Sequence, residues 1–209
     1  MSYILIHGLG QNPSSWQTVI EASQLPTHTY CPDLFQLLGE TDPSYENLYE
    51  KFKEDLDKKE GRIHLCGLSL GAILSLHYTI ERPEKVQSLI LIGAQYKMPK
   101  LILSMQNFVF QFMPNQTFSK LGINKKSFIS LTNSLKELDF TQQLEKITCP
   151  TLIVCGEKDL ANKPAFKHLS QTIQQAQAIM VKDAGHEINQ DHPHELAKVI
   201  DGFWHTTDY

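Results

Sequence analysis

The sequence predicts an α/β protein whose mostly parallel sheet is covered by helices on both faces. Short apolar runs alternate along the chain with longer stretches of helical periodicity. Runs that are apolar throughout favour strands buried on both faces, which is typical of parallel sheets. The candidate strands span residues 3–6, 28–31, 63–66, 86–92, 151–155 and 178–181.

The helical patterns and one interruption define the expected domain organisation. The clearest helical spacing occurs at residues 44–59, 70–80 and 193–205. The last of these begins with Pro193, which suits a first helical turn. The stretch from about 95 to 147 breaks the alternation, because it has no convincing strand pattern. We therefore expect one domain over residues 1–209, with an inserted helical cap at about 95–147.

Charge and composition argue against several classes of function. The 209 residues carry a formal net charge of −4 with acidic and basic residues interspersed, so neither a nucleic-acid partner nor an anionic membrane partner is expected. No apolar run approaches the roughly 18 residues that a membrane span needs. The start of the sequence shows no basic stretch or cleavage site, which predicts a cytoplasmic location. The oligomeric state is left open.

Neither a metal nor an organic cofactor is expected. The four cysteines form no C-x-x-C pair, which speaks against a metal or redox motif. The group Asp191, His192 and His194 is better explained as an exposed helix start than as metal ligands. Gly8-x-Gly10 follows a strand, as in a dinucleotide fingerprint, but Pro13 occupies the place of the third glycine and disfavours that alternative.

Residues 67–71 read Gly-Leu-Ser-Leu-Gly between a predicted strand and a predicted helix. This is the G-x-S-x-G pattern in the strand–turn–helix context that it requires. A sharp turn there would raise the Ser69 hydroxyl over the sheet edge, and side chains at the two glycine positions would collide with neighbouring backbone. The turn would also place the Leu70 N–H at a helix start, where positive partial charge gathers. Ser69 is therefore the candidate nucleophile.

The first strand ends in His7-Gly8-Leu9-Gly10. Glycines there would let the backbone approach a bound oxygen closely, so the N–H groups of Leu9 and Leu70 are the candidate oxyanion donors. We expect His7 itself to be structural, with its ring held by a backbone carbonyl.

An acid and a histidine each follow a later strand. Asp159 comes just after the strand at 151–155, and His186 just after the strand at 178–181. Open α/β sheets bind ligands at the carboxyl ends of their strands, so both side chains should reach the same edge as Ser69. The chain order Ser, Asp, His completes a candidate catalytic triad.

These segments together resemble the α/β-hydrolases, in particular the small bacterial serine esterases and C–C hydrolases. The resemblance covers the oxyanion turn at 7–10, the serine turn, the segment from Cys149 to Asp159 and the segment from Ala184 to Glu195. It implies an α/β-hydrolase fold that lacks the family's first two strands and carries a small cap. After Asp33 the usual Pro-Gly turn is replaced by Leu-Phe-Gln.

The resemblance implies a serine hydrolase, because family members that act as dehalogenases or epoxide hydrolases carry aspartate where Ser69 stands. The expected reaction is cleavage of an ester, thioester, amide or lactone of a small, largely apolar substrate through an acyl-enzyme. His186 would remove the Ser69 proton, so activity should rise with pH as His186 becomes neutral. Two alternatives stay open: a C–C bond hydrolase or lyase of the same fold, and a hydrolase-like protein that binds a ligand without turnover.

The cap supplies the candidate pocket residues. Apolar side chains at 101–113 fall on one broad helical face, from which we expect Met105, Phe108 and Phe112 to line the substrate pocket. Packing of this face on the domain below is an equally open alternative. Only Arg62 and Arg82 are arginines, and both are predicted far from Ser69, so substrates with several carboxylates or acyl-CoA-like polyanions are not expected.

Overall fold

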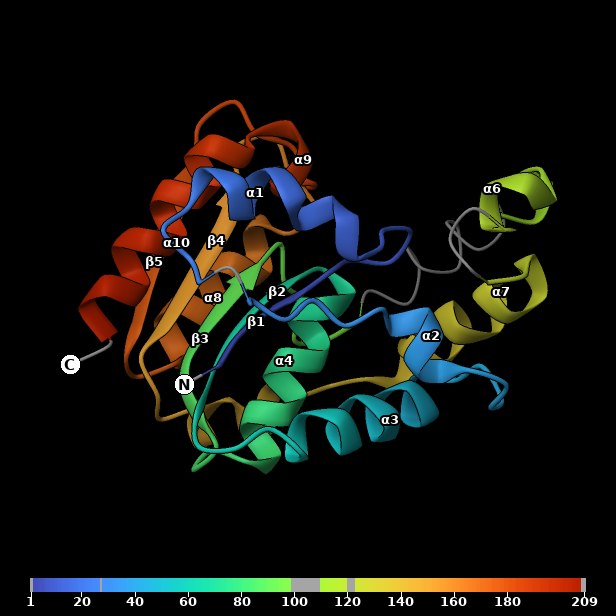
Figure 1. Cartoon of the computed structure of the whole chain (residues 1–209), viewed down its shortest axis with the longest axis horizontal. Helices are drawn as coiled ribbons and strands as arrows, with labels where there is room; N and C mark the ends of the chain where they lie inside the picture. Colours follow the sequence, from blue (N-terminus) through green and yellow to red (C-terminus); the bar gives the residue numbers. More distant parts are fainter. Residues whose placement is uncertain (1, 27, 99–109, 120–122, 208–209) are drawn as a thin grey trace.

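The computed structural model describes residues 2–26, 28–98, 110–119 and 123–207. Its centre is a five-stranded sheet in the order β1-β2-β3-β4-β5, in which every neighbouring pair is parallel (Figure 1). The strands are β1 (Ser2–Ile6), β2 (Ile63–Leu68), β3 (Val86–Ile92), β4 (Thr151–Gly156) and β5 (Ala176–Val181). The predicted α/β class with a parallel sheet is confirmed.

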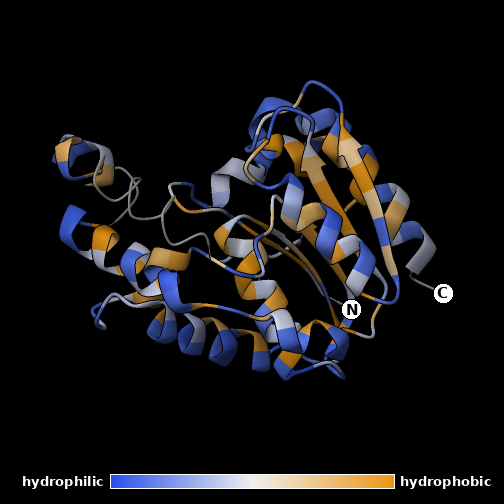
Figure 2. Ribbon diagram, turned by 180° about the vertical axis from the view of Figure 1, so that it is seen from behind, coloured by the Kyte–Doolittle hydropathy of each residue, from blue (hydrophilic) through white to orange (hydrophobic). Residues whose placement is uncertain are grey.

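Helices cover both faces of this sheet. One face carries η1 (Pro13–Trp16), α1 (Gln17–Ala22), α9 (Ile188–Asp191) and α10 (Pro193–Thr207). The other carries α2 (Leu34–Leu38), α3 (Tyr45–Asp57), α4 (Leu70–Glu81) and α8 (Lys163–Thr172). Each layer buries its own apolar cluster against the sheet, and Figure 2 shows the strands as mostly hydrophobic between more polar outer helix surfaces. Within the described ranges, no helix is long and apolar enough to cross a bilayer.

The predicted strand at 28–31 is wrong. Only Tyr30 bridges to Ile4 beside β1, although its N–H and C=O both bond to the β1 backbone. Prolines at 26 and 32 flank this run, and a proline has no N–H with which to extend a ladder. The sheet therefore ends in one bridging residue rather than a strand.

Between β3 and β4, the regular elements of the described residues are helices. It contains α6 (Asn115–Ser119), α7 (Lys125–Ser134), η2 (Leu135–Glu137) and η3 (Thr141–Lys146). Its described residues form no strand beyond an isolated bridge between Lys97 and Asp139. In Figure 1, α6 and α7 project to one side of the sheet and its covering helices.

Candidate active site

The turn between β2 and α4 has the strained geometry that the motif predicts. Ser69 has φ 53° and ψ −112°, a left-handed conformation that costs a non-glycine residue energy. A Cβ on Gly67 would overlap the backbone of Gly71, and a Cβ on Gly71 would overlap the carbonyl of Ile6. The Ser69 N–H donates to the Ile92 carbonyl at 2.9 Å, which ties the turn to the end of β3. Backbone contacts thus hold this serine at the carboxyl edge of the sheet.

Asp159 and His186 meet at the same edge, from the loops after β4 and β5. His186 Nδ1 lies 2.7 Å from Asp159 Oδ2. The acid is 7% exposed, whereas the His186 side chain is 39% exposed and open to the cavity described below. Because a carboxylate can only accept, Nδ1 carries the proton of this bond and the lone pair stays on Nε2. That tautomer is the one a general base needs.

A third polar side chain completes the surroundings of the acid. Asn162 Nδ2 donates to Asp159 Oδ1 at 2.9 Å and to Oδ2 at 2.8 Å. Burial raises the pKa of the Asp159 carboxyl, but the hydrogen bonds from His186 and Asn162 outweigh it and hold the pKa below its ordinary value. Asp159 is therefore ionised at neutral pH.

Gly93, at the end of β3, makes room for the histidine. It has φ +55°, and a Cβ at this position would lie 2.9 Å from both Nδ1 and Cε1 of His186. Only glycine offers both this backbone conformation and this space. The imidazole therefore packs directly on the backbone of the central strand.

The two predicted oxyanion residues lie beside Ser69. Leu9 and Leu70 line the same cavity as the serine. Leu70 is the first residue of α4, so its N–H has no partner inside the helix.

The loop that carries Leu9 is held by a buried amide pair. Gln11 Nε2 donates to Asn189 Oδ1 at 3.2 Å, and Asn189 Nδ2 donates back to Gln11 Oε1 at 3.0 Å. Gln11 Oε1 also accepts the Gly8 N–H at 3.3 Å. This pair links the oxyanion loop to α9, the helix that follows His186.

Other residues singled out from the sequence have structural partners. His7 Nδ1 bonds the Gly8 carbonyl at 2.9 Å, and its Nε2 accepts the Leu34 N–H at 3.2 Å. The Asp33 carboxylate caps α2 by accepting the N–H groups of Phe35 and Gln36. Arg62 bonds the Val86 carbonyl at the start of β3, and Arg82 follows the last turn of α4, so both are at the edge opposite Ser69. Within the described ranges, no three His, Cys, Asp or Glu side chains gather as a metal site.

A cavity of about 600 Å³ opens above the serine. Ser69, Asp159 and His186 line it together with the polar side chains of Gln95 and Asn162. Most of its remaining wall is apolar, formed by Leu9, Ile73, Met98, Phe110, Met113, Phe118, Phe128 and Leu135. Among the described residues, no lysine or arginine lines it, and Glu187 is the only ionisable side chain besides Asp159 and His186.

Three apolar residues are predicted from the sequence to line the pocket. Met105 and Phe108 lie outside the described residues. Phe112 was wrongly predicted, because it is 74% exposed and is absent from the cavity wall, which Phe110 and Met113 supply instead. Residues three apart share a helix face, so this helical turn directs 110 and 113 inward and 112 outward.

Comparison with known proteins decides the family. A sequence model described as the alpha/beta hydrolase family matches residues 3–128. The chain belongs to this family. Human monoacylglycerol lipase ABHD6 is 23% identical over 99% of this chain and 77% of its own length. Lipase 1 of Psychrobacter immobilis is 28% identical over 88% of this chain and 70% of its own length.

Solved structures agree on the fold. MenH from S. aureus superimposes with a TM-score of 0.81 at 17% identity, over 100% of this chain and 95% of that one. Carboxylesterase CesB from Bacillus subtilis gives 0.73 at 21% identity, over 97% of this chain and 83% of that one. The α/β-hydrolase resemblance and the prediction of a hydrolase are thereby confirmed, and the lipase and esterase names among these proteins support ester hydrolysis in general.

Proposed function

We propose that this α/β-hydrolase is a serine esterase that cleaves a small, largely apolar ester through an acyl-enzyme, with Ser69, His186 and Asp159 as its triad. The observation that carries the proposal is that these three side chains line one cavity. The 2.7 Å hydrogen bond between Asp159 and His186 also supports the proposal, because it keeps the imidazole proton on Nδ1 and leaves Nε2 available as the base. Thioesters, amides and lactones would react by the same steps.

In the first half-reaction, His186 Nε2 removes the proton of the Ser69 hydroxyl as the serine oxygen attacks the carbonyl carbon. The imidazolium that results is stabilised by ionised Asp159. As the tetrahedral intermediate collapses, His186 gives its proton to the leaving alcohol, and the acyl group stays on Ser69. Water then attacks the acyl-enzyme with His186 again as base, which releases the acid and restores the serine.

The backbone N–H groups of Leu9 and Leu70 are the proposed oxyanion donors. They flank the serine, and the start of α4 adds the positive end of a helix dipole. Loss of one such donor typically costs about 3 kcal/mol of transition-state stabilisation. Because the Gln11–Asn189 pair holds the loop of Leu9, the donor is in place before the substrate arrives.

We further propose that the segment at about 95–147 acts as a cap whose described part shapes the acyl site. Phe110, Phe118 and Phe128 come from this segment and pack edge to face against one another beside the cavity. An apolar wall whose described residues include no cationic side chain favours neutral acyl groups. Esters that carry several carboxylates, or CoA esters, should gain less than tenfold in kcat/KM over matched neutral esters, a limit of about 1.4 kcal/mol.

The decisive experiment replaces the nucleophile. Ser69→Ala should lower turnover of an activated ester by about 10⁴-fold or more, and His186→Ala about as much, because the two act as a unit. A fluorophosphonate probe should label Ser69 in the wild-type protein and leave the Ser69→Ala variant unlabelled. Ser170→Ala is the matched control, since this hydroxyl bonds the Lys167 carbonyl and does not line the cavity. Wild-type turnover by the Ser69→Ala variant would disprove the proposal.

A further inference from the structure

Asn162 occupies a helix-capping position but does not cap its helix. It precedes the first residue of α8, where asparagine normally accepts a hydrogen bond from the helix backbone. Its side chain makes no such bond. The amide instead turns to both oxygens of Asp159, at 2.9 and 2.8 Å. Asn162 is 7% exposed, so this contact is made away from water.

A second side chain fixes the orientation of that amide. Gln95 Nε2 donates to Asn162 Oδ1 at 2.6 Å. If the Asn162 amide were turned over, its oxygen would face the carboxylate and its NH₂ group would face the Gln95 donor, so both contacts would be repulsive. Gln95 thus keeps the Asn162 donors on Asp159. The four side chains form one chain of contacts from Gln95 through Asn162 and Asp159 to His186.

The contact has a consequence for the imidazole. Asn162 Nδ2 lies 3.1 Å from His186 Nδ1, so two donors converge on the same carboxylate. A carboxylate that accepts extra hydrogen bonds has less negative charge to offer the imidazolium. It is also held in one plane, which fixes the direction in which the imidazole points. Neither effect requires Asn162 to touch the substrate.

We propose that Asn162, oriented by Gln95, is a positioning residue that fixes the Asp159 carboxylate and moderates its pull on the His186 proton. The inference rests on the proposed function, because it assigns a role within the same triad. The other titratable groups near Asp159 and His186 do not take over the role of the Asn162 amide. Burial raises the pKa of Cys155 on β4 to about 11, so it stays neutral, while Glu187 lies along the cavity and Lys163 lies in the first turn of α8.

The test uses Asn162→Ser, because serine is as good a residue at a helix start as asparagine but is too short to reach both oxygens of Asp159. We expect the variant to fold with a lower unfolding midpoint, because the Asp159 carboxylate loses two hydrogen bonds while the helix start keeps a suitable residue. We also expect kcat to fall about three- to tenfold with little change in KM, as for a group that acts on the transition state. The acidic limb of the pH–rate profile should move to higher pH by at least about 0.3 units, since the less satisfied carboxylate holds the imidazolium more tightly.

Gln95→Met tests the coupling. It removes the donor without adding charge and should lower kcat about threefold alone, yet add nothing in the Asn162→Ser background. Ser44→Ala, which removes the cap of α3 at a residue that does not line the cavity, controls for stability loss and should leave the acidic limb in place. An unmoved acidic limb in Asn162→Ser, or additive effects of the two variants on kcat, would overturn the inference.

A readout without turnover separates this inference from the proposed function. In Ser69→Ala protein, the proton between His186 Nδ1 and Asp159 should give a strongly downfield NMR signal, and Asn162→Ser should change its position and pH dependence. If that change is seen while the wild-type protein hydrolyses no ester, the esterase proposal fails and the inference about Asp159 stands. An unchanged signal overturns the inference, whatever the activity.

Discussion

The carboxyl edge of the sheet and the segment between β3 and β4 build the two halves of the cavity in different ways. At the sheet edge, backbone atoms set the geometry: glycines at 67, 71 and 93 sit where any Cβ would collide with its neighbours. In the segment between β3 and β4, the wall consists of apolar side chains that pack on one another. A Cβ at Gly67 or Gly71 would meet backbone that cannot move aside, and one at Gly93 would meet the His186 ring, whereas apolar packing tolerates exchange at similar volume. We therefore expect substitutions at the sheet edge to change mainly the reaction rate. Substitutions in the segment between β3 and β4 should change mainly which substrate is preferred.

The largest effect expected at the sheet edge follows from Gly93→Ala. Its Cβ would lie 2.9 Å from two ring atoms of His186, so the ring must move. A displacement approaching 1 Å of a catalytic group costs about 100-fold in rate, so we expect kcat/KM to fall roughly 10- to 100-fold. Steady-state kinetics with an activated ester measures the loss.

Gly61→Ala is the matched control for this change. Gly61 has φ +69°, and no atom lies within 4 Å of the place that a Cβ would occupy there, so alanine brings the same backbone strain without the collision. Both variants should lose similar stability, and only Gly93→Ala should lose activity. Equal activity in the two variants would mean that the His186 ring is not held by the strand beneath it.

In the segment between β3 and β4, Phe110→Ala should change selectivity more than rate. Phe110 lines the cavity and Phe112, two residues on, is 74% exposed, so the pair forms a matched comparison within one helical turn. Removing the Phe110 ring should move the preferred acyl chain to longer esters and raise KM for short ones several-fold, with kcat changed by less than about twofold. Phe112→Ala should keep the wild-type preference. A panel of esters from acetyl to decanoyl measures both; an unmoved optimum in Phe110→Ala would show that this wall does not bound the acyl site.

The same contrast explains what the sequence could predict. Ser69, Asp159 and His186 line one cavity, and the sequence predicts their common edge from a local turn motif and from the ends of parallel strands, which are both short-range signals. Gly93 is a site residue that the sequence could also have predicted, because it directly follows a strand at the edge that binds ligands. No local sequence signal predicts the contact of Asn162 with Asp159, because only the folded structure decides whether its amide caps α8 or reaches the carboxylate. The prediction of Phe112 is wrong because the helical phase of an interrupted apolar stretch is poorly determined by its sequence.

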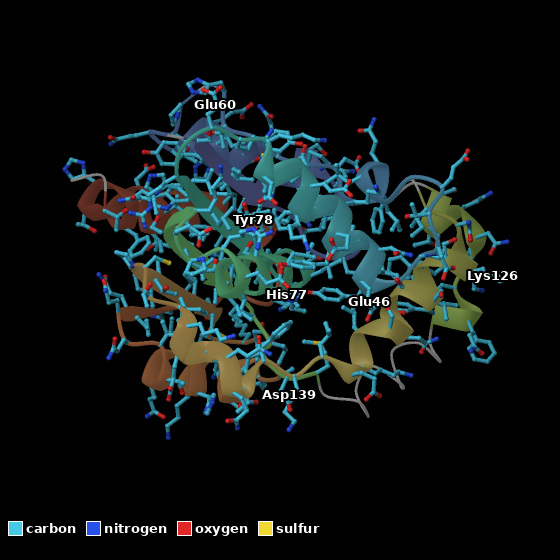
Figure 3. The ribbon with its side chains drawn as sticks, turned by 90° about the horizontal axis from the view of Figure 1, so that it is seen from below. Glu46, Glu60, His77, Tyr78, Lys126 and Asp139 are labelled. Atoms are coloured by element: carbon cyan, nitrogen blue, oxygen red, sulfur yellow. The ribbon has the colours of Figure 1, made fainter. Side chains whose placement is uncertain are left out.

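A smaller response to acid is expected where α3 and α4 pack against the segment between β3 and β4. His77 of α4 lies at this junction (Figure 3). Its ring stacks on Tyr49 at 3.7 Å and lies 4.9 Å from Phe140 of the segment between β3 and β4, and its Nδ1 is 3.1 Å from the Tyr45 hydroxyl. Burial lowers the pKa of His77, against the opposing effect of Glu81. The folded protein thus favours neutral His77.

Because the pKa of His77 is lower in the folded state than in the unfolded chain, its neutral form contributes full stability above the unfolded value of about 6.5. That contribution is lost as pH falls below about 6.5, where the unfolded chain takes up the proton first. His7, whose pKa burial also lowers, adds in the same direction. Urea unfolding at pH 8 and pH 5 should show a loss of stability in the wild type that is smaller in His77→Gln by up to about 1 kcal/mol. The difference in unfolding free energy between the two proteins at pH 8 is the baseline, since His77 is neutral there. If both proteins lost the same stability between pH 8 and pH 5, His77 would not bind its proton differently in the folded and unfolded states.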